Sequence, residues 1–157
     1  MINLPEDQKT WVPWMRRSIQ LALLAEGRTS PNPLVGAIVL DSSGRLVGEG
    51  FHSGAGNPHA ETEALAQAGK NSVDGTIVVT LEPCCHEGLT PPCTEAIIKA
   101  GLKRVVIGMV DPDPRVSGNG ISRLKDFGLE VIEGVLNQEC ESINREFSFR
   151  VRHGRPW

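Results

Sequence analysis

The sequence predicts an α/β fold with three layers (α/β/α), in which a mixed, largely parallel sheet lies between helices on both faces. Short β-branched runs alternate with helical patterns along the chain, and the first two runs form a hairpin around residues 41–44. No internal repeat divides the chain, and its 157 residues, of which 39% are hydrophobic, suffice for one core of this kind.

The elements follow from the hydrophobic period and from glycine and proline at the boundaries. We expect strands over residues 34–41, 45–51, 76–82, 104–110 and 129–135. We expect helices over residues 10–26, 59–69, 93–101, 120–128 and 137–153, the last as one continuous closing helix. Pro58 and Pro92 are placed at first helical positions, because proline is favoured there.

Composition and charge narrow the class of protein. The net charge of −3 argues against a general nucleic-acid binder. The amino terminus lacks the basic and apolar regions of a secretory signal, and no run approaches the roughly 18 apolar residues of a membrane span. We therefore expect a cytoplasmic protein with no membrane partner. Clustered cysteines in that reducing compartment are more often metal ligands or catalytic thiols than disulfides.

Residues 80–93, TLEPCCHEGLTPPC, hold three of the four cysteines. A catalytic zinc ion has three protein ligands and an open position for water, whose pKa it lowers to about 7. His59 and Glu61, in HAE, do not share a helix face and reach one site only from a first helical turn. Together with Cys84 of the P-C pair and Cys93, they form the pattern of zinc nucleobase deaminases with a lengthened loop. The pattern predicts three zinc ligands and Glu61 as the general acid and base.

Two other interpretations of the cysteines stay open. Cys85 can complete a closed structural zinc site, although adjacent Cys84 and Cys85 do not easily both bind one tetrahedral ion. One cysteine can instead serve as a nucleophile, although none stands apart from the cluster. Cys140, in the last expected helix, is interpreted as a buried apolar side chain.

Four segments carry a resemblance to a known family: NPLVGAIV at 32–39, the HAE motif, the TLEPC and TPPC block, and MVDPDPRVSGNGI at 109–121. With them, nearly the whole chain resembles the deaminase half of the bifunctional riboflavin-biosynthesis deaminase/reductases, the RibD family. The resemblance implies a cytidine deaminase-like fold with five strands, a homo-oligomer and Zn²⁺. It also implies hydrolytic removal of the 2-amino group of 2,5-diamino-6-(5-phosphoribosylamino)pyrimidin-4(3H)-one.

The resemblance also implies roles for single residues. His59, Cys84 and Cys93 match the family's zinc ligands, and Glu61 matches its proton shuttle. The substrate-pocket positions that match, or that we add as neighbours in the same loop, are Asn32, His52, His86, Asp111, Asp113 and Arg115.

Two positions depart from the family pattern. Leu89 stands where a basic residue is usual, so it cannot pair with an anion. Asp113 replaces an amide with a charge that would repel a nearby substrate phosphate, and Arg115 is close enough in sequence to compensate. We expect intact zinc chemistry with altered substrate affinity or turnover.

The resemblance sets the expected organisation of the chain. Residues 1–153 are expected to form the deaminase domain, and residues 154–157 the start of a linker to a reductase domain that this chain lacks. Two alternatives for the function remain: a zinc deaminase that acts on another base or base-like substrate, and a catalytically idle zinc module that serves as a scaffold.

Overall fold

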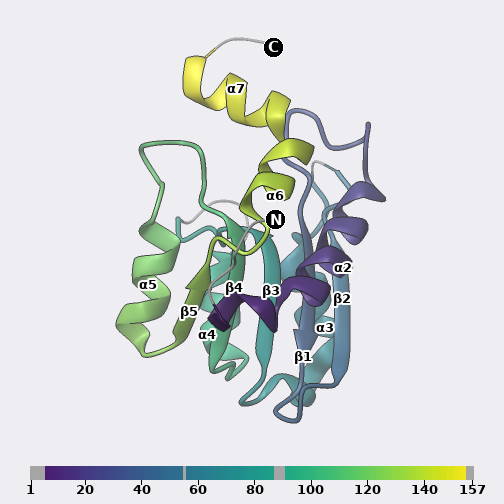
Figure 1. The fold of residues 1–157 in the computed structure, drawn as a ribbon, viewed down its shortest axis with the longest axis vertical. Helices are drawn as coiled ribbons and strands as arrows, with labels where there is room; N and C mark the ends of the chain where they lie inside the picture. The colour runs from purple at the N-terminus through teal and green to yellow at the C-terminus, as the bar shows by residue number, and fades with distance from the viewer. Residues whose placement is uncertain (1–5, 55, 87–90, 155–157) are drawn as a thin grey trace.

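Five strands form one sheet in the computed structural model, which describes residues 6–54, 56–86 and 91–154. The strand order is β2-β1-β3-β4-β5 (Figure 1). The strands are β1 (Gly36–Leu40), β2 (Leu46–Phe51), β3 (Thr76–Leu81), β4 (Arg104–Met109) and β5 (Glu130–Glu133).

The sheet is mixed, as the sequence predicts: four of its five strands run in the same direction, and β1 runs against them. β1 pairs with both β2 and β3 in antiparallel fashion, while β3, β4 and β5 are parallel. The connection from β2 through a helix to β3 does join two strands of the same direction, as such crossovers do. β1 is inserted between these two strands, so both of its pairings become antiparallel.

Helices cover both faces of the sheet. On one face α2 packs against β1 and β3, and α6 packs against β4; on the other, α3 packs against β1 and β2 and is followed by α4 and α5 (Figure 1). None of the described helices is long and apolar enough to cross a membrane. The helices are α1 (Glu6–Lys9), α2 (Val12–Leu23), α3 (Ala60–Ala68), α4 (Cys93–Lys99), α5 (Asn119–Phe127), α6 (Asn137–Ile143) and α7 (Arg145–His153), with a short 3₁₀ turn at Gly69–Ser72.

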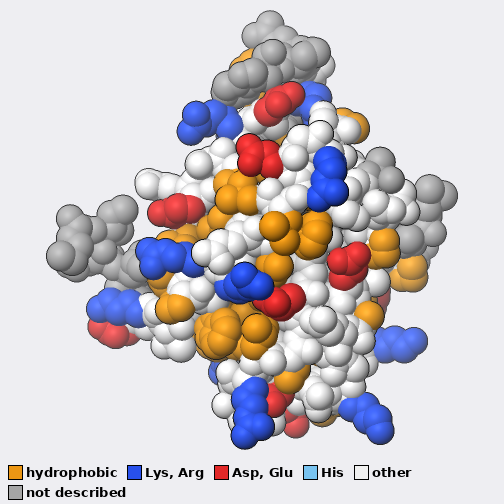
Figure 2. All heavy atoms as spheres, turned by 90° about the vertical axis from the view of Figure 1, so that its right-hand side faces the viewer, with side chains coloured by type: hydrophobic (Ala, Val, Ile, Leu, Met, Phe, Trp, Pro, Cys, Tyr) orange, Lys and Arg blue, Asp and Glu red, His pale blue; other side chains and the backbone are white. Residues whose placement is uncertain are grey.

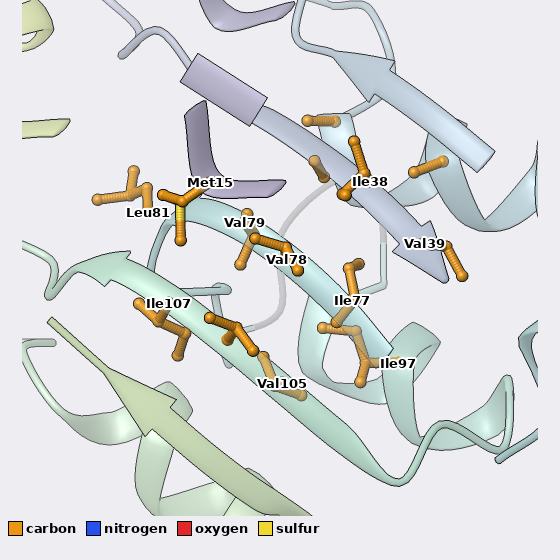
Figure 3. Packing of buried hydrophobic residues seen from close by; sticks show 14 of the residues in the cluster. Met15, Ile38, Val39, Ile77, Val78, Val79, Leu81, Ile97, Val105 and Ile107 are labelled. Atoms are coloured by element: carbon orange, nitrogen blue, oxygen red, sulfur yellow. The ribbon is translucent and has the colours of Figure 1, made fainter. Parts of the chain in front are cut away.

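The core lies on both sides of β1, β3 and β4. Every residue of β1 and β3 is buried, which explains why these strands read as continuous apolar runs rather than alternating ones. Met15 from α2 and Ile97 from α4 are fully buried against this central part of the sheet (Figure 3). The three-layer prediction is confirmed.

β2 is an edge strand whose outer side is engaged by side chains of two helices. Arg17 of α2 donates to the Glu49 carboxylate at 2.5 Å, and the Glu49 backbone N–H donates to the Gln67 side chain of α3 at 2.6 Å. Figure 2 shows this side of the molecule, where acidic and basic side chains are interspersed with apolar ones. Covered and charged edges of this kind oppose strand-to-strand aggregation.

Gly36 gives the closest approach between α2 and the sheet. A Cβ atom added there would lie 1.9 Å from the Ser18 carbonyl oxygen, which is helix backbone and cannot move aside alone. We expect Gly36→Ala to lower the free energy of unfolding by about 2–3 kcal/mol, as overpacking does. Urea denaturation measures this, with the exposed substitution Ala66→Ser as the control; a Gly36→Ala protein of unchanged stability would contradict the close approach of α2 to β1.

Both prolines that the sequence places inside helices lie before them. Pro92 is the N-cap residue of α4, and Pro58 precedes His59, the N-cap of α3. His59 has extended backbone angles (φ −70°, ψ 158°), and the residue before it is already outside the helix. His59 therefore lies at the point where the chain enters α3, and not in the first helical turn that the sequence predicts.

The predicted continuous closing helix over 137–153 is wrong, because Asn144 divides it into α6 and α7. Asn144 has φ −118° and ψ 26°, outside the helical region, and is only 3% exposed. Its side chain accepts from the Leu34 N–H at 2.7 Å and donates to the Leu34 carbonyl at 2.8 Å. These two buried hydrogen bonds to a distant segment offset the broken helical turn.

Candidate metal centre and its pocket

Three side chains that are far apart in the sequence converge at the end of the sheet where β3 finishes. His59 enters α3, Cys93 is the first residue of α4, and Cys84 follows β3. The ligand atoms of all three lie within 4.8 Å of one another, and His59 Nδ1 is 3.2 Å from Cys93 Sγ. The helix starts explain the convergence, because each presents its side chain beyond the end of the helix.

This donor set fits zinc. One imidazole nitrogen and two sulfurs are ligands that zinc prefers, and such atoms around one tetrahedral ion lie about 3.5 Å from one another. Cys85 is not part of the cluster among the described residues, although it adjoins Cys84. Three donors leave a coordination position open, which is typical of catalytic rather than structural zinc sites.

The two thiols of the cluster interact directly. The Cys93 N–H donates to Cys84 Sγ at 3.3 Å, and a hydrogen bond from the Cys93 thiol lowers the pKa of Cys84 to about 4. The same interaction raises the pKa of Cys93. One sulfur is thus held as a thiolate, the form that binds metal.

Glu61 lies beside the cluster in the first turn of α3 and is 4% exposed. Burial raises the pKa of its carboxyl above the ordinary value. It lines a pocket of about 250 Å³ together with His59 and Cys84. The carboxyl therefore faces the same space as the donor atoms.

Asn32 and His52 form the side of this pocket that lies at the hairpin. Asn32 precedes β1 and His52 follows β2, and the antiparallel pairing brings these two ends together. Asn32 Nδ2 lies 3.2 Å from His52 Nε2, and His52 Nδ1 lies 3.2 Å from the Pro58 carbonyl oxygen. If Nδ1 carries the proton that it donates to Pro58, Nε2 accepts from Asn32, and the Asn32 amide is oriented.

His86 and Asp111 line the same pocket, whereas Asp113 and Arg115 are not among its described lining residues. Arg115 Nη2 lies 2.8 Å from the Asp113 carboxylate, and this pair lowers the pKa of Asp113 to about 2. The negative charge that the sequence introduces at Asp113 is thus balanced by Arg115, outside the pocket. Leu89 lies outside the described residues.

Phe147 of α7 and Glu82 are among the lining residues that the sequence analysis missed. Glu82 is 5% exposed, and its carboxylate accepts three backbone N–H groups, from Asp111 (3.0 Å), Gly118 (3.0 Å) and Ile121 (3.1 Å). The TLEPC motif is recognised by its cysteine. Glu82 forms its hydrogen bonds with a loop far along the chain, and no local sequence pattern indicates such contacts.

Glu82→Gln is expected to lower the free energy of unfolding by about 2 kcal/mol, because one buried backbone N–H would face an amide NH₂ instead of an oxygen. Thermal and urea denaturation measure the change. The control is Glu130→Gln, whose carboxylate pairs with Arg104 at the surface and contributes little. Equal stability of both variants would mean that the Glu82 hydrogen bonds do not hold the Asp111 loop.

Comparison with known proteins defines the class. The sequence profile of the family described as the cytidine and deoxycytidylate deaminase zinc-binding region matches residues 9–109. The chain belongs to this family of zinc-dependent deaminases, which confirms the predicted enzyme class and Zn²⁺ as its cofactor.

Individual proteins similar to this chain are enzymes of riboflavin biosynthesis and a pyrimidine deaminase. The chain is 52% identical to the riboflavin biosynthesis protein RibD of Synechocystis over 91% of this chain but 39% of that protein. It is 48% identical to the diaminohydroxyphosphoribosylamino-pyrimidine deaminase of Buchnera aphidicola over 91% of this chain and 97% of that protein. RibD of Acinetobacter baumannii has the same fold, with a TM-score of 0.92 and 43% identity over 97% of this chain and 43% of that one. The resemblance and the cytidine deaminase-like fold are confirmed.

Proposed function

We propose that the protein deaminates 2,5-diamino-6-(5-phosphoribosylamino)pyrimidin-4(3H)-one to 5-amino-6-(5-phosphoribosylamino)uracil and ammonia, a step of riboflavin biosynthesis. The observation that carries the proposal is a single pocket faced by Glu61 and by the donor atoms of His59 and Cys84. The likeness to the Buchnera deaminase over 97% of that protein supports the choice of substrate.

Each residue has a part in this proposal. His59, Cys84 and Cys93 would hold the zinc ion, which would supply an activated water molecule at its open position. Glu61 takes a proton from the water and delivers it to the departing amine. Asn32 and His52 bind the pyrimidine edge, since an amide offers both a donor and an acceptor.

His86 and Asp111 are also proposed to bind the substrate. Both line the pocket, and partial burial raises the pKa of Asp111. We propose that Asp113 and Arg115 contact the substrate as an ion pair in the loop that follows Asp111.

Ammonia release from the purified, zinc-loaded protein with the diaminopyrimidine tests the proposal. Turnover that depends on zinc supports it. Turnover of another base in a panel of cytosine, guanine and adenine derivatives, without turnover of the diaminopyrimidine, would favour the alternative substrate. No turnover of any base by a folded, zinc-replete protein would favour the idle zinc module.

We further propose that residues 1–153 are the deaminase domain and that a linker to a reductase domain begins at 154. The longer RibD relatives support this, because the chain spans 39% of the Synechocystis protein. Residues 155–157 lie outside the described residues. The mass of the protein in its native cells tests the proposal, and a mass equal to that of this chain would contradict it.

A homo-oligomer and a cytoplasmic location complete the proposal. All four cysteines are free thiols, as is usual in a reducing compartment. Light scattering measures the oligomeric state, and a monomer would contradict the proposed homo-oligomer. Cell fractionation measures the location, and a secreted protein would contradict the proposed cytoplasmic location.

A further inference from the structure

Phe147 places an aromatic ring in the wall of the pocket, although α7 lies beyond residues 9–109 that match the deaminase family. The described polar groups of the pocket include the amide of Asn32 and the carboxyl of Glu61, whereas Val35 and Leu81 are apolar and aliphatic. Among the described lining residues, Phe147 alone offers a phenyl face. A planar pyrimidine can be stabilised on such a face, because bases stack on aromatic side chains.

The position of Phe147 depends on a few specific contacts. Figure 1 shows α7 beyond the end of the sheet, away from the strands that bury the core. Asn144, at the start of α7, is bound to both backbone groups of Leu34. Arg150, one turn after Phe147, donates to the Pro31 carbonyl. Both ends of the helical turn that carries Phe147 are therefore bonded to residues 31–34, the segment that also carries Asn32.

Arg150 also supports the ring itself. Its guanidinium carbon lies 5.9 Å from the centre of the Phe147 ring, within range of a cation–π interaction. Phe147 and Asn32 both line a second cavity of about 210 Å³, which Arg150 lines as well. The Phe147 ring thus lies at the boundary between the two cavities. Arg150 lies on the side of the 210 Å³ cavity.

We propose that Phe147 is a specificity-determining residue of the deaminase, the aromatic surface on which the pyrimidine ring of the substrate stacks, and that Asn144 is its positioning residue. This inference rests on the proposed function. In this proposal, the selection of substrate depends on the contacts that hold α7 against residues 31–34.

The test compares Phe147→Leu with Phe149→Leu on the same helix. Phe149 contacts the His153 ring and lines a different cavity, between α6 and α7. With the diaminopyrimidine as substrate, we expect Phe147→Leu to raise KM about 10-fold, since stacking is lost, with kcat within about 3-fold of the original. Phe149→Leu is expected to leave KM unchanged, and zinc content is expected to be equal in all proteins.

Asn144→Asp tests the positioning role. The carboxylate keeps an oxygen for the Leu34 N–H but loses the donor to the Leu34 carbonyl. We expect a rise in KM like that of Phe147→Leu, with kcat nearly unchanged and zinc retained. A lower kcat at unchanged KM, or loss of zinc, would overturn the positioning role.

Binding in a Glu61→Gln background separates this inference from the proposed function. Calorimetry gives the dissociation constant of the diaminopyrimidine with and without Phe147→Leu, and we expect about a 10-fold increase. Turnover by the unaltered protein with an unchanged KM in Phe147→Leu would overturn the inference alone. If the pyrimidine binds but is not converted by the unaltered protein, the proposed function fails. The inference about Phe147 then depends on whether Phe147→Leu raises the dissociation constant. A protein that neither binds nor converts it overturns both.

Discussion

Glu61→Gln is expected to lower kcat for deamination by about 10³-fold, while one zinc ion per chain stays bound. The amide fills the same buried space in the first turn of α3 but cannot accept and return a proton. The carboxyl faces the pocket beside His59 and Cys84, so its loss affects the reacting atoms directly. Steady-state ammonia release and metal analysis of the same preparation give both numbers.

Glu63→Gln is the matched control, because Glu63 lies in the same first turn of α3 but is not among the described residues that line the pocket. Its kcat is expected to remain within about 2-fold of the original, as for a substitution away from the reacting atoms. Equal activity of Glu61→Gln and the unaltered protein would remove Glu61 from the chemistry and leave the proton transfers to another group.

Cys93→Ser is expected to abolish both zinc binding and turnover. Cys93 is 2% exposed and its sulfur lies 3.2 Å from His59 Nδ1, so a hydroxyl at that position leaves the ion with two strong ligands. We expect zinc content below about a tenth of an equivalent after dialysis. Metal analysis and activity are measured on the same sample, with circular dichroism to show that the sheet is retained.

Cys85→Ser is the control for this variant, and it also decides between two kinds of zinc site. Cys85 adjoins Cys84 but lies outside the donor cluster, so zinc content and activity are expected to be unchanged. Loss of zinc in Cys85→Ser would instead indicate a closed site with four protein ligands, which has no position for water.

Much of this fold could be predicted because its signals are local. The five strands are short apolar runs bounded by turn residues, and the helices between them carry a regular hydrophobic period. The donor cluster was also predictable, since HAE and P-C are recognisable motifs whose residue types have few other common uses. Local patterns thus predicted the elements and the three side chains that cluster at the candidate metal centre.

The features that escaped prediction depend on contacts between distant segments. Nothing near Asn144 marks a helix break, because the hydrogen bonds that favour the break go to Leu34, 110 residues away. The insertion of β1 between β2 and β3 is likewise a choice among pairings that the same strands permit. In the sequence Phe147 is one apolar residue of a closing helix, and only the break at Asn144 shows how its helix reaches the pocket.

The bond between Asn144 and Leu34 has a consequence for the order in which the protein assembles during synthesis. The proposed zinc ligands lie in one stretch of the chain, since Cys93 follows His59 by 34 positions, and they emerge from the ribosome together. The pocket wall that includes Phe147 forms only after about 50 further residues have been made, at rates of about 5–20 residues per second. For an interval of seconds, a nascent chain therefore contains all three proposed metal ligands but not yet the helix that completes the pocket.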